Sequence, residues 1–590
     1  MVLDAANLAY PHWLSPGDNA WQLVAATLVG LMCLPGLAVL YGGLVQRKWV
    51  VNTMLMAFAG FSLVLVVWVL WAYDMSFGTF AHLGPAGSFL GDLVGRPGSI
   101  LGSPVEQSQA RSGANSLIPF HYSTSTLAYF QFVFAAITPL LFLGSVLGRM
   151  KFKAWLLFVP LWTTFVYTVN AALLWGGGYF AQKGAVDYSG GYVIHLAAGV
   201  AGFVAAAMVG PRARKDRSST SPHNMLLVAV GAGILWLGWN GFNGGDPFYA
   251  GVDAASAVLN TNVATAAALL TWMGADMTLG KSRKPTFAGA VNGMVCGLVG
   301  ITPAAGWVNG YGALAIGVLC ASVVWTAMAF LPRIRPFSKV DDALGVVYTH
   351  GIAGLCGGLL VGILADPSMI EYGVTGRHFA GKGAVSVGGL VYTGSWHQAW
   401  EQLLAACWVV GFTAAATALL LFVVKLVCRG LRERDELLDA GDFAIHDEQV
   451  DHHRVPAAVQ WLSEEQLAEV VDAIVGAAGR VRSAGLPRDG LRRPPRRVGV
   501  AEVGGLVHAE VVVEPVPKGD PGRDVEAGDV VVGDRVEVLS ERADAVAVGD
   551  HQHRATPRAG GAQVGHDHVV PVGEHPGDDV REALGGRQDV

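Results

Sequence analysis

Long apolar runs alternate with short polar segments through the first three quarters of the chain. A helix needs about 20 mostly apolar residues to cross the apolar core of a membrane, and about eleven runs approach or exceed that length. The runs lie near Trp21–Tyr41, Thr53–Gly78, Leu127–Leu147, Ala154–Trp175, Gly190–Val209, His223–Asn243, Ala255–Leu279, Phe287–Pro303, Gly310–Phe330, Leu344–Leu364 and Trp396–Val427. The pattern predicts an all-α polytopic membrane protein with eleven transmembrane helices.

Basic residues gather in every second loop between these runs. The clusters are Arg47 and Lys48; Arg149, Lys151 and Lys153; Arg212, Arg214, Lys215 and Arg217; Lys281, Arg283 and Lys284; Arg333, Arg335 and Lys339; and Arg429, Arg432 and Arg434. Cytoplasmic loops carry such an excess of Lys and Arg, so the N-terminus is expected outside and the C-terminus in the cytoplasm. We interpret the clusters as determinants of topology and assign them no nucleic acid or other partner.

Composition agrees with this class of protein. The 590 residues are 52% hydrophobic and 15% charged, with 77 glycines and a mean hydropathy of +0.43. Small residues let transmembrane helices approach closely. The six cysteines lie in apolar segments without metal-ligand spacing, so neither a disulfide framework nor a metal site is expected. No cleavable signal is expected, because the residues before Trp21 contain no basic n-region and no small-residue cleavage site.

The character of the chain changes after the last apolar run. We predict an eleven-helix domain over residues 1–434 and a polar cytoplasmic segment, expected to be regulatory, over 435–479. Residues 480–590 contain one lysine, Lys518, and no aromatic residue. Disorder is the default expectation for such a composition, which could also come from reading a GC-rich gene past its true end in another frame.

The stretch from Asp187 to His195 places an acid and an imidazole at the start of a membrane-length run. An ionised carboxylate at a bilayer centre costs about 2.5–3.5 kcal/mol on insertion scales, so such groups pair, line a path or lie at an interface. Asp187 falls just before the helix, where it could simply accept hydrogen bonds from the first free backbone N–H groups. Both a capping and a functional role remain open for it. His195 lies on the apolar run itself.

Four motifs carry a resemblance to a known family. They are the run Pro35-Gly-Leu-Ala-Val-Leu-Tyr-Gly-Gly-Leu-Val45, the run Asp187-Tyr-Ser-Gly-Gly with His195, the run Gly238-Trp-Asn-Gly-Phe-Asn243, and Asp341-Asp342 followed by His350-Gly351. In this order they resemble the ammonium transporter family (Amt/Mep/Rh), with a bacterial Amt-like member as the nearest type. The likeness covers about Gly17 to Asp451, and the family's topology of eleven spans with the N-terminus outside is the one predicted above.

The resemblance implies roles for particular residues. His195 and His350 correspond to twin histidines that share a hydrogen bond in a narrow pore, with Trp239 in the pore wall. Phe134, in the run Phe130-Gln-Phe-Val-Phe134, and Phe242 correspond to two stacked rings that gate the outer mouth. Phe130 and Trp175 correspond to the aromatic wall where ammonium is recruited, and Asp187 to the acid that supports this site.

Each of these residues also has a purely structural reading. A histidine in a span can be a packing residue, Phe134 and Phe242 can belong to the core, and Trp175 can belong to the aromatic belt at the membrane surface. The motif context is what favours the functional readings.

Two departures from the family pattern stand out. Asn243-Gly244-Gly245 is followed by Asp246 where the family commonly has a serine that faces the recruited cation. We expect a water-facing, ionised carboxylate at this position, which either strengthens cation capture or only caps the loop before Pro247. Near His350, Gly345 and Val347 replace an acid and an aromatic residue that the family often has.

The expected function is ammonium transport in the inner (plasma) membrane of the cell. Aromatic faces attract a small cation with about 0.5–2 kcal/mol per contact, whereas a bare cation in an apolar pore costs tens of kcal/mol, so deprotonation on the way is favoured. The resemblance implies a homotrimer, methylammonium as a substrate analogue, a PII-type regulatory protein as partner, and no cofactor. The alternatives are an ammonium-sensing receptor, which needs an output domain after Asp451, and an intramembrane metalloenzyme, which needs a third ligand beside the histidines.

Overall fold

The computed structural model describes residues 10–111, 119–218, 221–369, 371–372 and 385–448, and two short strands further on. The chain divides into two units, Met1–His452 and His453–Val590. The second unit contributes the antiparallel pair β5 (Arg497–Gly499) and β6 (Glu510–Val512). The boundary expected near residue 480, the tail expected beyond it and any output domain after Asp451 lie outside the described residues, apart from these two strands.

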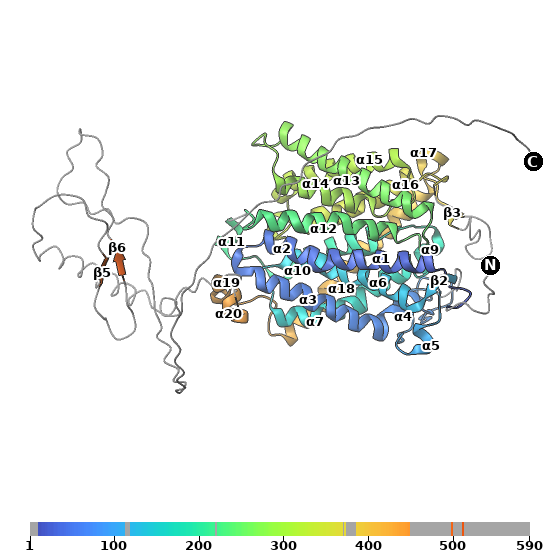
Figure 1. Ribbon diagram of the computed structural model, residues 1–590, viewed down its shortest axis with the longest axis horizontal. Helices are drawn as coiled ribbons and strands as arrows, with labels where there is room; N and C mark the ends of the chain where they lie inside the picture. The colour runs from blue at the N-terminus through green and yellow to red at the C-terminus, as the bar shows by residue number, and fades with distance from the viewer. Residues whose placement is uncertain are drawn as a thin grey trace, which may run out of the picture. The chain divides into compact units, whose positions relative to one another are not determined.

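The first unit is a bundle of long apolar helices (Figure 1). The helical segments that make up the apolar runs are α1 (Pro16–Leu31), α2 (Ala38–Leu44), α3 (Val50–Val67), α4 (Tyr73–Phe77), α6 (Thr124–Val146), α7 (Phe152–Trp162), α8 (Thr168–Leu174), α10 (Ala197–Val209), α12 (Met225–Gly244), α13 (Val252–Thr278), α14 (Phe287–Ile301), α15 (Gly310–Phe330), α16 (Ala353–Leu364) and α18 (His397–Val427). All eleven apolar runs predicted from the sequence coincide with these helices, which confirms the all-α polytopic organisation.

The described part of the chain contains ten helices long and apolar enough to cross a membrane. The remaining run, Phe287–Pro303, forms α14 (Phe287–Ile301), which has 15 residues. At 1.5 Å per residue such a helix is about 22 Å long, shorter than an apolar core of about 30 Å. The count of eleven spans and their orientation therefore remain predictions.

Short elements connect the long helices. They are α5 (Ser103–Glu106), α9 (Tyr179–Lys183), α11 (Arg214–Ser218), α17 (Leu390–Thr393), α19 (Asp435–Ala440), α20 (Asp442–His446), the 3₁₀ turns η3 (Arg47–Trp49), η7 (Leu331–Arg333) and η8 (Phe337–Lys339), and the strands β1 (Gln109–Arg111), β2 (Pro119–Ser123), β3 (Glu371–Tyr372) and β4 (Val385–Ser386). The strands form the antiparallel pairs β1–β2 and β3–β4.

Several spans contain wider π-helical turns. These are η2 (Met32–Leu37), η4 (Trp68–Ala72), η5 (Thr163–Tyr167), η6 (Gly191–Leu196) and η9 (Val347–Ile352). The first three interrupt a helix, whereas η6 begins the span of α10 and η9 begins the span of α16. Such turns often mark functional sites. Each of η6 and η9 contains one of the two motif histidines.

The centre of the bundle is formed by α6, α10 and α16. Helix α6 is buried along nearly its whole length and packs against α10, which also contacts α18 and η9. Helix α16 packs against α14 and α18. The outer helices expose apolar side chains, among them Leu226, Leu237, Leu259, Leu270 and Phe422. This distribution is typical of a protein whose surrounding medium is lipid.

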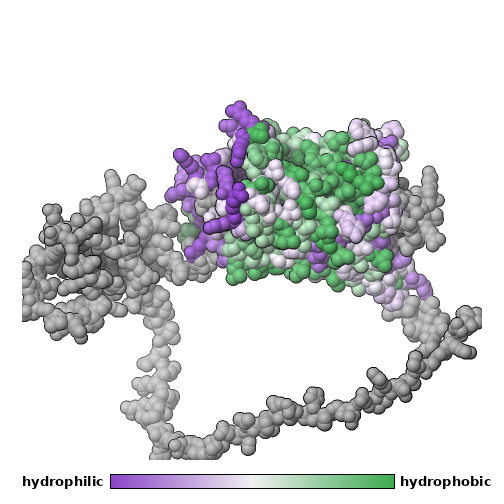
Figure 2. Space-filling view, turned by 90° about the horizontal axis from the view of Figure 1, so that it is seen from above, coloured by the Kyte–Doolittle hydropathy of each residue, from purple (hydrophilic) through white to green (hydrophobic). Residues whose placement is uncertain are grey.

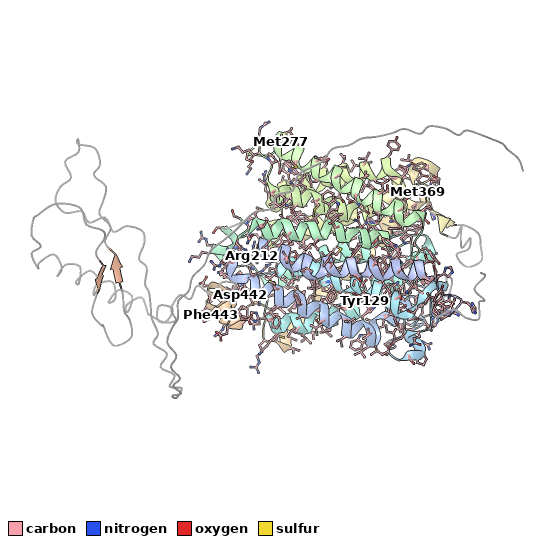
Figure 3. The ribbon with its side chains drawn as sticks, viewed as in Figure 1. Tyr129, Arg212, Met277, Met369, Asp442 and Phe443 are labelled. Atoms are coloured by element: carbon pink, nitrogen blue, oxygen red, sulfur yellow. The ribbon has the colours of Figure 1, made fainter. Side chains whose placement is uncertain are left out.

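The two ends of the bundle are polar and its lateral surface is apolar. Figure 2 shows a hydrophobic belt, with hydrophilic side chains gathered mostly at the end that carries α11. Arg212 and Asp442 lie at this end and Met369 at the opposite one (Figure 3). The basic loop after α10 and the segment after α18 thus occupy the same end, as the alternation of basic loops predicts.

Candidate functional site

Two helices that begin with π-turns run in opposite directions through the centre of the bundle. The Arg212 guanidinium, just beyond α10, pairs with Asp341, just before η9, at 2.7 Å between Nη2 and Oδ1. The end of one helix therefore lies beside the start of the other. Each helix begins with an aspartate eight residues before its histidine: Asp187 before His195, and Asp342 before His350.

Both aspartates cap their helices. The Asp187 carboxylate accepts hydrogen bonds from the backbone N–H groups of Tyr192 and Val193 at 2.9 Å and of Gly190 at 3.2 Å. Asp342 Oδ2 accepts from the N–H of Val347 at 2.8 Å. A carboxylate at this position satisfies free donors and interacts favourably with the positive end of the helix dipole. Capping is thus the role that the contacts give to Asp187.

Burial raises the pKa of Asp187 to about 6, although the backbone N–H groups of residues 190–193 lower it. The carboxyl is only 5% exposed, because the chain around it folds against Trp175 and the turn at Pro303. Asp187 is therefore a positioning group for the start of η6, and its carboxylate is occupied by the helix.

Glycines allow the two helices to touch backbone to backbone. A Cβ atom added to Gly199 would lie 2.3 Å from the Cα of Gly351, and one added to Gly354 would lie 2.5 Å from the carbonyl oxygen of Gly191. Both distances are far below van der Waals contact, so no larger residue fits without a backbone shift. Gly351 directly follows His350. The crossing therefore brings the two histidines into contact.

His195 and His350 are buried and hydrogen-bonded to each other. Their Nδ1 atoms lie 3.2 Å apart, and the rings are nearly parallel, with centroids 5.3 Å apart and an interplanar angle of 24°. One Nδ1 must carry a proton and the other must accept it, so the two neutral rings hold opposite tautomers. The Nε2 atom of His195 is buried and makes no hydrogen bond to any described residue.

A continuous stack of rings leads from His195 to α6. The ring of His195 lies 5.4 Å from that of Trp239 and 5.9 Å from that of Phe242, both on α12. Phe242 stacks on Phe134 with centroids 4.4 Å apart and an interplanar angle of 29°. The structure thus brings together the residues that the sequence assigned to the gate and to the pore.

Phe130 and Trp175 border this stack on the side away from the histidines. Phe130 lies 4.8 Å from Phe134, one helical turn along α6, and Trp175 meets Phe134 edge-on at 6.3 Å. The Trp175 indole donates a hydrogen bond to the backbone oxygen of Asp187 at 2.6 Å, which fixes its ring. Trp175 is partly exposed, whereas Phe130 is buried. Both residues therefore lie against Phe134, and their role as an aromatic recruitment wall stays a prediction.

Asp246 does not face water, and that expectation from the sequence is wrong. Its side chain is 8% exposed. The N–H of Phe248 bonds to the carbonyl of Gly245 at 2.9 Å, and the Phe248 ring packs on Phe120 and Phe130, so the turn folds inward. Burial raises the pKa of Asp246 well above its usual value, with a contribution from the charge of Asp187, and the nearby Ser189 hydroxyl acts in the opposite direction.

The sequence motifs gave no role to Thr302 and Ser189, which also contact the site. Trp239 donates to Thr302 Oγ1 at 2.9 Å, and Ser189 donates to the backbone oxygen of Phe242 at 2.9 Å, which ties the gate to the start of η6. Asp342 was noted only as part of a motif. Its spacing to His350, equal to that between Asp187 and His195, was the available signal for a second cap. The sequence contains no comparable signal for the contacts of Gly199 and Gly354, because glycines occur throughout the chain.

Within the described ranges no group of three or more His, Cys, Asp or Glu residues is arranged to hold a metal ion. The metalloenzyme alternative needs such a third ligand.

Residues 20–450 match the model of the Ammonium Transporter Family. The chain belongs to this family. It is 47% identical over 447 residues to "Ammonium transporter 3 member 2" of Oryza sativa subsp. japonica, covering 74% of this chain and 90% of that protein. It is 42% identical over 482 residues to "Ammonium transporter 2" of Arabidopsis thaliana, covering 80% and 96%.

Solved structures agree with this membership. The structure of Saccharomyces cerevisiae Mep2 aligns with a TM-score of 0.62 at 27% identity, over 75% of this chain and 94% of that one. A chain described as "Sensor Amt Protein" aligns with a TM-score of 0.60 at 25% identity, over 72% and 96%. The ammonium-transporter fold predicted from the motifs is thereby confirmed.

Proposed function

We propose that this member of the family transports ammonium or ammonia across the membrane, recruiting the cation at an aromatic site and passing it through a ring gate to the histidine pair. The observation that carries the proposal is the unbroken series of rings from Phe130 and Trp175 through Phe134 and Phe242 to His195 and His350, described above. Membership of the family, whose curated relatives are called ammonium transporters, supports the same substrate.

Recruitment rests on the faces and edges of the outer rings. Ammonium binds to an aromatic face with about 0.5–2 kcal/mol, more strongly as water is excluded. Trp175 suits this role because Asp187 holds its indole in place and because part of its surface is open to solvent. The buried Asp246 adds a carboxyl near the Ser189 hydroxyl, in the turn whose Gly245 abuts Phe130, and an arriving cation would favour its ionised form.

Passage beyond the gate favours the neutral species. The stacked rings of Phe134 and Phe242 present apolar surface to a charged ammonium, and burying an isolated charge costs many kcal/mol. If ammonium loses its proton before the two rings move apart, the neutral ammonia that passes does not carry this desolvation cost. The proton could then follow a separate route or be relayed by the imidazoles.

The histidine pair suits a small neutral guest. With one proton shared between the Nδ1 atoms, one Nε2 is a donor and the other an acceptor, which matches the donors and the lone pair of ammonia. The free Nε2 of His195 supports this role, since a buried polar atom without a partner is uncommon.

The proposal places the protein in the inner (plasma) membrane as a homotrimer with one pore per subunit. It also includes regulation by a PII-type protein at the cytoplasmic face. These points rest on the resemblance to the family and on the exposed apolar lateral surface of the bundle.

The test is transport by the purified full chain in sealed liposomes. Pulses of ammonium, methylammonium and potassium are compared, with current and internal pH recorded together. We expect ammonium to give the largest response, methylammonium a smaller one, and potassium none. Folded protein that moves no ammonium by either readout contradicts the proposal. Equal responses to potassium exclude the ring gate.

A further inference from the structure

A cavity of about 600 Å³, lined by both basic and apolar residues, opens at the end of the bundle that carries the basic loops. Its walls come from the start of α7, the end of α18 and the segment that follows, including α20. The polar side chains that line it are Lys151, Lys153, Arg429, Glu433 and His446. The three cations Lys151, Lys153 and Arg429 outnumber the one carboxylate, so the cavity has a positive character. His446 is not counted among the cations, because burial keeps its pKa below the usual value.

The hydrogen bonds around the cavity distinguish fixed groups from available ones. Lys151 Nζ donates to the backbone oxygens of Cys428 and Arg429 at 3.4 and 3.1 Å, so it holds the end of α18 in place. Lys153 and Arg429 are exposed; Lys153 lies on α7, and Arg429 lies in the turn just after α18. No side chain caps the N-terminus of α7, where free N–H groups favour an anion.

His446 contributes a further donor. Asn52 Nδ2, which can only donate, lies 2.9 Å from His446 Nε2, so the neutral ring carries its proton on Nδ1. The ring also packs edge-on against Phe152, with centroids 5.4 Å apart. The cavity wall formed by α20 is therefore rigidly joined to the starts of α3 and α7.

The neighbourhood of the cavity is apolar and faces lipid. Leu426 and Val427, at the end of α18, are 63% and 65% exposed, and Val427 also lines the cavity with Phe152 and Ile445. A ligand that combines a phosphate with hydrocarbon chains satisfies both parts of this surface. A free phosphate would fill only a small part of the volume.

We propose that this cavity binds the phosphate head group of an anionic phospholipid, which links α7 and α18 to the segment from Glu433 to His446. The lipid's chains lie along the exposed end of α18. Lys153, Arg429 and the first N–H groups of α7 contact the phosphate, while Glu433 limits how much negative charge the site accepts. Basic pockets between transmembrane helices are suited to such head groups.

The test uses the full chain in detergent and measures retention of phosphatidylglycerol and phosphatidylcholine by native mass spectrometry. The variant Lys153→Gln/Arg429→Gln removes two available charges and leaves Lys151 in its structural role. Its matched control is Arg214→Gln/Lys215→Gln, which removes two exposed charges from α11 at the same end. We expect phosphatidylglycerol to be retained over phosphatidylcholine, and the first variant to bind it about thirtyfold more weakly.

The possible outcomes are distinct. An equal loss in the control variant means that only general surface charge attracts the lipid, and overturns the proposal. Glycerol 3-phosphate that binds as tightly as the lipid identifies a site for soluble phosphates and also overturns it. Protection of residues 435–446 from hydrogen exchange on adding phosphatidylglycerol, lost only in the first variant, supports it. Transport activity does not enter these readouts, so the proposed function is tested separately.

Discussion

His195 and His350 lie with their Nδ1 atoms 3.2 Å apart, although 155 residues separate them in the chain. The contact depends on two helices of opposite direction that cross at glycines, and each helix is capped by an aspartate eight residues before its histidine. The pair therefore belongs to the architecture of the bundle. A change at the crossing should act on both histidines together.

The first prediction concerns the pair itself. His195→Ala or His350→Ala removes one partner of the shared hydrogen bond and one of the two Nε2 atoms. Leaving a buried polar group unpaired costs about 1–3 kcal/mol, or roughly five- to hundredfold in rate, so ammonium flux should fall by this factor or change its charge. His397→Ala, at a 71% exposed histidine, is the control and should leave flux unchanged. Unchanged flux in both pore variants would reduce the pair to packing residues.

The second prediction concerns the helix crossing. Gly199→Ala places a Cβ within 2.3 Å of Gly351, so the helices must separate, at a cost of about 1–3 kcal/mol. We expect a lower midpoint of thermal unfolding in detergent and weaker ammonium flux. Gly411→Ala on α18 is the matched control, because no atom lies within 4 Å of the added Cβ. It should be neutral or stabilising by about 0.5–1 kcal/mol. Equal midpoints for the two variants would contradict the tight crossing.

The third prediction concerns docking of the segment after α18. The Asp442 carboxylate accepts from the N–H groups of Val51 and Asn52 at 2.8 and 2.9 Å, and so caps α3 from a distant part of the chain. Lys48 Nζ donates to the backbone oxygen of Leu438 at 2.8 Å. Burial raises the pKa of Asp442 to about 6 in the docked state, although these backbone N–H groups lower it.

A carboxyl whose pKa is raised by docking holds its proton more tightly when docked. Docking is therefore fully favoured below the undocked pKa of about 3.9, and weakens as pH rises through about 6. Hydrogen exchange of residues 435–446, corrected for intrinsic rates, should show stronger protection at pH 5 than at pH 7.5. Asp442→Asn should remove this dependence, whereas Asp439→Asn, at an exposed position, should keep it. Equal protection across this pH range in the unmodified chain would exclude Asp442 as the titrating group.

The sequence predicted the positions of the apolar helices well, because hydropathy is a local signal. Hydropathy over 20 residues locates a membrane helix, and the Asp187 and His195 motif fixes the start of one helix whatever its neighbours are. The contact of Gly199 with Gly351 was not predictable in this way. It depends on which glycines face each other after folding, and the chain has 77 of them.

Asp246 is a second residue whose contacts could not be predicted from the local sequence. Its position at the end of a span suggested exposure to water, yet the turn that contains it packs under Phe248. The hydropathy pattern along the chain predicts how deep in the membrane a residue lies. It does not predict whether a neighbouring loop covers that residue. The prediction of a water-facing carboxylate failed for this reason, and the pH dependence of transport becomes the test of its charge.

The last prediction concerns Asp246. Because burial raises its pKa well above the usual range, the carboxyl is protonated at low pH and becomes ionised only as pH rises. Asp246→Asn mimics the protonated form, so this variant and the unmodified protein should need the same ammonium concentration for half-maximal flux at low pH. At higher pH the ionised carboxylate attracts the cation, and the unmodified protein should saturate at a lower concentration than the variant.

The dependence on salt separates this role from general surface charge. A buried carboxylate is screened far less than an exposed one, so the difference between the two proteins at high pH should persist as ionic strength rises. Asp253→Asn, which removes a partly exposed acid on the nearby start of α13, is the control, and its smaller effect should vanish in salt. Identical half-saturation of the Asp246→Asn variant and the unmodified protein at every pH would show that the charge of Asp246 has no part in recruitment, and would leave it as a residue that shapes the turn around Phe130.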